Sequence, residues 1–174
     1  MAVSYSEDWR RVASAVLSED RKYRYSLVRV WDDKRPRLVA IGLNPSTADE
    51  RNNDPTIVRV IGFADRWGYG GLWMLNLFAV RGSNPRILRE VDDPVGPGNK
   101  EAFDVILNLA DSTEVLCMWG SGGGYMEQDR TVMGWLDGWD FEAICLGQTK
   151  AGFPKHPLYL PYTTTTELYA GRLP

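Results

Sequence analysis

Apolar and polar positions follow two different periods along the chain, and their alternation predicts an α/β fold. Runs of consecutive apolar residues lie at 37–43, 72–78, 114–119 and 141–146, as expected for parallel strands buried on both faces. Segments with helical spacing lie between them, at about 55–67, 100–110 and 125–135. This order of strands and helices predicts a parallel sheet with helices on both faces.

The N-terminal third carries a different pattern. Ser6 and the acidic residues after it predict the start of a helix. Its apolar positions at 9, 12, 13, 16 and 17 recur at helical spacing. The β-rich run 23–31 then predicts a further strand, which forms a hairpin-like pair with 37–43 or lies next to it. We therefore predict a three-layer sandwich with a central, mostly parallel, four-stranded sheet, plus an N-terminal helix and strand.

Cap residues predict where the main helix begins and ends. Asp54 followed by Pro55 indicates a helix start, because a carboxylate caps free backbone N–H groups and proline suits the first helical position. Gly68 indicates its end. A glycine-rich turn is expected at 120–124. No repeat or linker divides the 174 residues, so we expect a single domain over 1–174.

Composition restricts the class of protein. The net charge of −3 does not indicate a strongly basic nucleic-acid binder. No apolar stretch approaches the about 20 residues of a membrane span, and residues 1–8 lack the features of a signal peptide. We therefore expect a cytoplasmic protein that does not bind membranes. Six arginines nevertheless cluster within forty residues and could form a local basic face: Arg51, Arg59, Arg66, Arg81, Arg86 and Arg89.

The metal-binding residues are sparse. Cys117 and Cys145 both lie in apolar runs, where thiols usually pack as small hydrophobic groups. Neither belongs to a Cys-x-x-Cys pair, so zinc and iron–sulfur sites are not indicated, and we predict no cofactor. The acidic segment 49–54 has two interpretations, a solvated loop with a helix cap or a set of carboxylates that holds a metal.

Polar residues follow each of the four predicted parallel strands. They are the Asn44 turn, Asn76, the segment 119–122, and the segment 147–160 with His156, the only histidine. Right-handed crossovers place these loops at one edge of the sheet, where open α/β sheets bind ligands. Each could also have a structural role: a turn at Asn44, a buried amide network at Asn76, a satisfied loop histidine at His156. The glycines at 122–124 lack the Lys-Ser or Lys-Thr of a phosphate-binding loop.

Four segments together resemble a known superfamily. The segment 42–46 (Gly-Leu-Asn-Pro-Ser) resembles the first motif of the uracil-DNA glycosylase superfamily, in the Gly-x-Asn-Pro form of the mismatch-specific uracil and thymine glycosylases. The segments 75–81, 115–121 and 155–158 resemble its later motifs, in the same order. The segments 44–49, 54–56, 67–71, 76–79 and 156–160 are similar to the domain-of-unknown-function family 1643 over nearly the whole chain.

The glycosylase resemblance implies a reaction, hydrolysis of the N-glycosidic bond of a pyrimidine or modified pyrimidine nucleotide. It implies that Asn44 orients the attacking water, that Asn76 binds the pyrimidine edge, and that His156 donates to the developing oxyanion at O2. Phe78, or else the aromatic residues at 153 and 159, would stack on the base, and a leucine at 158 or 160 would act as a wedge. The substrate-binding residues implied in this way are Gly42, Pro45, Ser46, Asn76, Phe78, Arg81, Gly120, Ser121, Pro157 and Leu158.

The sequence also departs from the glycosylase pattern. Leu158 and Tyr159 follow His-Pro where small polar residues are expected, and an acidic loop stands where glycosylases have an aromatic-containing loop. Net acidity argues against tight binding of long duplex DNA, so single-stranded or modified DNA, or a free nucleotide, fits better. Two other functions stay open: a nucleotide or nucleic-acid binding protein without catalysis, and a metal-assisted enzyme that modifies nucleobases. The oligomeric state is not indicated.

Overall fold

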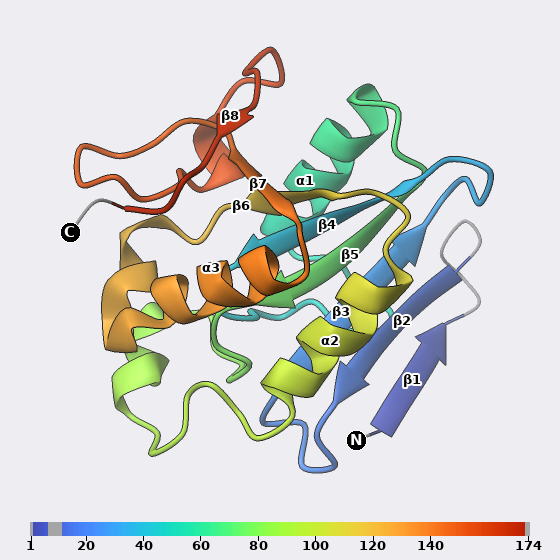
Figure 1. Ribbon diagram of the computed structural model, residues 1–174. Coiled ribbons are helices and arrows are strands. Elements are labelled where there is room, and N and C mark those ends of the chain that lie inside the picture. Colours follow the sequence, from blue (N-terminus) through green and yellow to red (C-terminus); the bar gives the residue numbers. More distant parts are fainter. Residues whose placement is uncertain (1, 7–11, 173–174) are drawn as a thin grey trace.

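The protein is built on one mixed β-sheet covered by helices (Figure 1). The computed structural model describes residues 2–6 and 12–172, and within them the sheet has eight strands in the order β1-β2-β3-β5-β4-β6-β7-β8. The strands are β1 (Ala2–Ser6), β2 (Val12–Leu17), β3 (Arg24–Val30), β4 (Arg37–Gly42), β5 (Gly71–Asn76), β6 (Glu114–Cys117), β7 (Glu142–Cys145) and β8 (Glu167–Leu168).

The four predicted parallel strands form the centre of this sheet. β4 pairs in parallel with β5 on one side and with β6 on the other, and β6 pairs in parallel with β7. The prediction of a four-stranded, mostly parallel sheet was wrong in extent. The pairs β1–β2, β2–β3, β3–β5 and β7–β8 are antiparallel, so antiparallel strands extend the parallel centre at both edges.

The predicted N-terminal helix is wrong at both ends, because Ser6 is the last residue of β1 and residues 12–17 form β2. In β2 the side chains of Ala13, Ala15 and Leu17 are buried, two residues apart, on one face. The same run also fits a helical period through Ala13, Val16 and Leu17, so periodicity alone did not distinguish the two. Antiparallel pairing with β3 decided in favour of a strand. Part of the predicted helix, residues 7–11, lies outside the described residues.

Strand β3 has a different neighbour in the sheet from the one predicted. β3 pairs with β5 rather than with β4, because β5 returns after the first helix into the position between them. The connection 31–36 therefore crosses the end of β5, and Gly70 at that point donates from its backbone N–H to the carbonyl of Pro36. The prediction that 23–31 and 37–43 are neighbours was wrong, although both are strands.

Helices cover both faces of the sheet, as predicted. α1 (Pro55–Arg66) packs on one face with the even-numbered residues of β4, whereas α2 (Asn99–Leu109) and α3 (Gln128–Gly138) pack on the other face with the odd-numbered ones. In Figure 1, α2 and α3 lie over the face turned to the viewer. Short 3₁₀ segments lie at Pro85–Arg89 (η1), Gly120–Glu127 (η2) and Pro157–Tyr159 (η3).

Several local predictions can be compared directly. The Asp54 carboxylate accepts a hydrogen bond from the N–H of Ile57, which confirms the helix cap at α1. α3 begins at Gln128, three residues later than predicted, because Met126 and Glu127 take left-handed backbone conformations. Both cysteines are free and buried. None of the helices in the described residues has the length and apolar character needed to cross a membrane.

Candidate functional site

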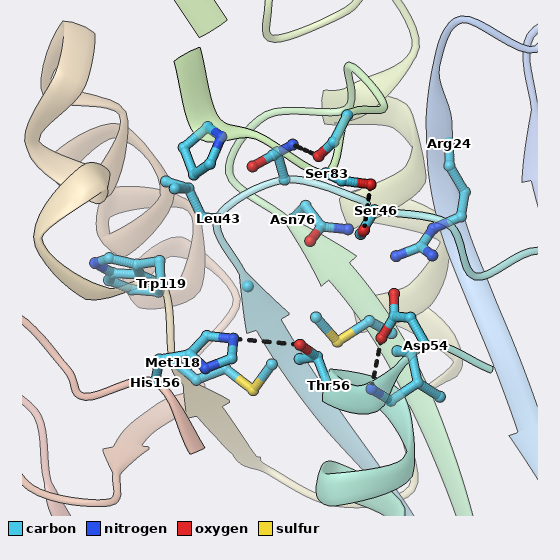
Figure 2. A pocket seen from close by; sticks show the side chains of 16 residues that line it. Arg24, Leu43, Ser46, Asp54, Thr56, Asn76, Ser83, Met118, Trp119 and His156 are labelled. Carbon is cyan, nitrogen blue, oxygen red and sulfur yellow. Dashed lines mark hydrogen bonds between the residues drawn. The ribbon is translucent and has the colours of Figure 1, made fainter. Parts of the chain in front are cut away.

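A cavity of about 230 Å³ lies at the carboxyl edge of the parallel strands (Figure 2). Its walls come from the loops after β4, β5, β6 and β7, together with the start of α1 and one side chain of β3. The structure thus brings together residues more than a hundred positions apart in the sequence. Among the predicted site residues, those that line the cavity are Gly42, Asn44, Ser46, Asn76 and His156.

Gly42 forms part of the cavity wall at the end of β4, and the absence of a side chain there is a requirement. A Cβ atom at this position would lie 2.7 Å from Met74 Cε and 3.0 Å from Asn76 Oδ1. Both distances are shorter than ordinary van der Waals contact. Glycine therefore leaves room for the Asn76 amide at the neighbouring strand end.

Asn44 is held by backbone carbonyls. Its Nδ2 donates to the Gly82 carbonyl at 2.9 Å and lies 3.3 and 3.4 Å from the carbonyls of Pro45 and Val80. Three acceptors around one nitrogen fix which end of the amide is the donor. The orientation leaves Oδ1 as the atom that can accept a hydrogen bond from a ligand.

Asn76 is the most unusual polar group of the site. Its side chain is 1% exposed, and its Nδ2 has no hydrogen-bond partner among the described residues. Its backbone is held in place by Asn99, whose side-chain amide donates to the carbonyls of Asn76 and Leu77. A buried donor without a partner costs about 1–3 kcal/mol. A ligand acceptor in the cavity would offset that cost.

His156 stands at the mouth of the cavity in a defined tautomer. Its Nδ1 accepts from the backbone N–H of Leu158 at 3.3 Å, so the ring carries its proton on Nε2. Nε2 lies 3.5 Å from Thr56 Oγ1 (Figure 2). Desolvation by the surrounding protein lowers the pKa of His156, and the Asp54 carboxylate opposes that shift. The ring is therefore a neutral N–H donor at neutral pH.

Two charged side chains in the cavity lining, those of Arg24 and Asp54, were not assigned to the site from the sequence. Arg24 of β3 is 1% exposed, and its Nη1 donates to the Ala48 carbonyl at 2.9 Å. Its Nε has no partner within the described chain, and burial lowers its pKa to about 10. Asp54 was predicted as a helix cap or a metal ligand, but not as part of a binding cavity. The available signal for Arg24 was a charged residue inside the predicted strand 23–31.

Two hydroxyl groups complete the polar lining and were also missed. Ser83 Oγ accepts from Ser46 Oγ at 3.1 Å, which joins the loop after β4 to the loop after β5. Thr56 lies in the first turn of α1 and faces His156. Serines and threonines in loops carry no distinctive sequence signal, so only the fold could place these two in the cavity.

Seven predicted site residues lie outside the cavity lining. Pro45 is buried beneath the first loop, and Phe78 is fully buried against Tyr125, so Phe78 cannot stack on a base in the cavity. Gly120 uses its backbone N–H to hold the Pro154 carbonyl, which removes that donor from any phosphate site. The other members of this set lie around the cavity without lining it, and Pro157 among them is buried in η3: Arg81, Ser121, Pro157 and Leu158.

The acidic segment 49–54 is tied down by the protein itself. Asp49 accepts from the backbone N–H groups of residues 51 and 52, and Glu50 pairs with Arg21 at 3.0 Å. Arg29, fully buried, donates to Asn53 and to the carbonyls of residues 49 and 52. In the part of the chain that is described, no group of three or more His, Cys, Asp or Glu side chains is placed to hold a metal ion.

Several arginines of the predicted basic face make contacts within the protein. Arg59 donates to the Leu160 carbonyl and stacks on Tyr162, and Arg66 also lies over the Tyr162 ring, 3.9 Å from its centroid. Arg81 donates to the Arg21 carbonyl. Arg51 and Arg86 are exposed. The arginines thus give a weaker basic surface than their number indicates.

Comparison with known proteins identifies a family. The model of the family described as "Protein of unknown function (DUF1643)" matches residues 24–158, a range that begins at Arg24 and contains every cavity residue discussed above. No curated protein matches the chain, and neither does any solved structure. On the strength of the family match, this chain is a member of the DUF1643 family.

Proposed function

We propose that the protein is a glycosylase-like hydrolase that cleaves the N-glycosidic bond of a pyrimidine or modified pyrimidine nucleotide. The observation that carries the proposal is the unpartnered Nδ2 of Asn76 inside a small cavity. A base edge supplies paired donors and acceptors for such an amide. The same cavity presents Asn44 Oδ1 and the Nε2–H of His156, two groups that the reaction would need.

The size of the cavity supports a single base as its occupant. About 230 Å³ is less than the roughly 300 Å³ at which pockets for larger ligands begin. A pyrimidine ring turned out of a strand would fill it and leave the sugar and phosphate at the mouth. Apolar side chains on the walls, Leu43 and Met118 among them, would contact the ring faces.

The arrangement also agrees with the uracil-DNA glycosylase resemblance of the sequence. The segments 42–46, 75–81, 115–121 and 155–158 follow β4, β5, β6 and β7 or overlap their ends, and each contributes to the cavity. We propose on this basis that the fold is of the uracil-DNA glycosylase type, with added antiparallel strands.

The proposed reaction uses Asn44 and His156 in distinct ways. The bond from C1′ to the base nitrogen breaks, and its electron pair leaves with the base while positive charge develops on the sugar. Asn44 Oδ1 accepts a hydrogen bond from the water that attacks C1′. The neutral His156 donates from Nε2 to the base oxygen where negative charge grows, an effect of about 3 kcal/mol or more. The water proton passes to the departing base or to solvent.

The first experiment is an excision assay. Labelled single- and double-stranded oligonucleotides carrying uracil, mismatched thymine or oxidised and otherwise modified pyrimidines are incubated with the protein, and alkali then cleaves any abasic sites. The matching free deoxynucleotides are assayed by release of the base. We expect excision by the wild type and none by Asn44→Ala or His156→Ala. Asn108→Ala, a change in an exposed residue of α2 that does not line the cavity, should retain activity.

Two results would count against the proposal. Excision that survives in both Asn44→Ala and His156→Ala would show that these groups do not carry the reaction. Absence of excision from every oligonucleotide and nucleotide, with saturable binding, would instead identify a nucleotide-binding protein without catalysis.

A further inference from the structure

We infer that the cavity selects a base with an exocyclic amino group next to a ring acceptor, as in cytosine and its derivatives, and that Asp54 is the selecting residue. The inference rests on the proposed function, since it names the class of base that the same cavity would take. It comes from the two buried charged residues, Arg24 and Asp54, which the resemblance did not include.

The two carboxylate oxygens of Asp54 differ in their hydrogen bonding. Oδ1 accepts from the N–H of Ile57 and caps α1, at 2.9 Å. Oδ2 has no hydrogen-bond partner within the described residues, and Figure 2 shows it directed into the cavity on the side of Arg24. The side chain is 6% exposed. A carboxylate oxygen that faces the cavity and accepts no hydrogen bond from the protein can accept one from an amino group of a ligand.

Arg24 supplies a positive charge opposite Asp54, but the two side chains do not form an ion pair. No ion pair joins it to Asp54 within 4.0 Å among the described residues, although the charge of Asp54 partly opposes the lowering of the Arg24 pKa by burial. Arg24 Nε and Asn76 Nδ2 are both buried donors without partners in the described chain. A ligand lying between the two charges could therefore accept from one side and donate to the other.

The polar groups match a cytosine-type edge better than a uracil-type edge. The cavity presents three donors, from Arg24, Asn76 and His156, and one free carboxylate oxygen from Asp54. Cytosine offers adjacent acceptors at O2 and N3 and one amino donor at C4. Uracil has a carbonyl at C4, which would face the carboxylate and be repelled by it. The cavity charges of Arg24 and Asp54 sum to zero, which also favours a neutral base over an anionic one.

The helix cap makes this inference testable by one substitution. In Asp54→Asn the side-chain oxygen must still accept from Ile57, so the new NH₂ group takes the place of Oδ2. Asparagine caps helices about as well as aspartate, so α1 should remain intact. The variant thus presents a donor where the wild type presents an acceptor, and its preference should change to bases with a carbonyl at C4.

Binding is measured by calorimetry with four probes: cytosine, uracil, and the two corresponding deoxynucleoside 5′-monophosphates. We expect the wild type to bind the cytosine probes about tenfold or more tightly than the uracil probes, and Asp54→Asn to reverse the order. Asp49→Asn is the matched control. It removes a carboxylate from the same loop, outside the cavity lining, and should keep the wild-type order.

Three results would overturn the inference: uracil probes bound as tightly as cytosine probes by the wild type, no binding of any probe, or an unchanged order in Asp54→Asn. The outcome is separable from that of the proposed function, because binding of free bases requires no bond cleavage. Cytosine selectivity without excision would support the inference and contradict the hydrolase. Excision of uracil with no effect of Asp54→Asn would do the reverse.

Discussion

The side-chain amide of Asn44 donates to the backbone carbonyl of Gly82 at 2.9 Å and so joins the loop after β4 to the loop after β5. This contact makes the nitrogen of the amide structural and leaves the oxygen for chemistry. It therefore distinguishes asparagine from aspartate at this position, although the two residues have the same shape.

Asn44→Asp should lower both stability and activity. Aspartate has no donor for the three surrounding carbonyl oxygens, so a negative charge would face them. We expect a loss of about 1–3 kcal/mol in the free energy of unfolding, measured by urea denaturation, with loss of excision. Asn84→Asp is the control. Asn84 uses its oxygen to accept from the N–H of Arg86, and aspartate can do the same. An active and fully stable Asn44→Asp would contradict this account.

His156 should give both activity and stability a defined dependence on pH. Its pKa lies below the ordinary 6.5 because of desolvation, so the neutral ring persists below that pH. Activity should fall as the pH falls through the lowered pKa, because protonation of Nδ1 removes the acceptor of the Leu158 N–H. The measurement is kcat/KM against pH. A loss of activity centred above pH 6.5 would contradict the prediction.

The sign of the stability effect follows from the same shift. Below about pH 6.5 the unfolded chain takes up a proton at this histidine more readily than the folded chain does, so the free energy of unfolding decreases there. Above that range both forms are neutral and the effect disappears. The chain has only one histidine. The difference in Tm between wild type and His156→Gln, followed from pH 7.5 to 5, should therefore isolate this contribution.

Arg24 and Arg29, five residues apart on β3, should respond very differently to the same change. Arg29 donates to Asn53 and to several backbone carbonyls, so Arg29→Met should destabilise the protein by about 3–5 kcal/mol. Arg24 makes one contact of this kind, a hydrogen bond of 2.9 Å to the carbonyl of Ala48, and its Nε has no partner in the described chain. Arg24→Met should cost less stability, about 1–2 kcal/mol, and weaken ligand binding about tenfold or more. Equal losses of stability with intact ligand binding in Arg24→Met would assign both arginines to the fold alone.

Tyr159 can distinguish an oligonucleotide from a free nucleotide as substrate. It is 90% exposed and lies in η3, three residues after His156 at the cavity mouth. Stacking of a base on an aromatic ring contributes about 1–3 kcal/mol. If the substrate is an oligonucleotide, Tyr159→Ala should raise its KM roughly five- to hundredfold with kcat and Tm nearly unchanged. Equal kinetics of Tyr159→Ala and wild type on an oligonucleotide would show that this ring does not contact the strand.

The candidate site was predictable where sequence and topology act together. Asn76 lies near the end of a strand-like run, and Asn44 and His156 come after two others. The rule that ligands bind at the carboxyl edge was sufficient to bring them to one cavity. Arg24 and Asp54 were missed for opposite reasons. Arg24 belongs to an antiparallel strand whose place beside β5 was not predicted. Asp54 was explained as a helix cap, a role that uses only one of its two carboxylate oxygens.

The sequence by itself determined the four central strands, the three helices and the cap at Asp54, because apolar periodicity and capping are local properties of the chain. The tertiary structure decided the rest. Pairing with β3 made 12–17 a strand rather than a helix, and the return of β5 between β3 and β4 placed Arg24 at the cavity. Such choices depend on long-range hydrogen bonding between strands, whose partners a local pattern does not specify.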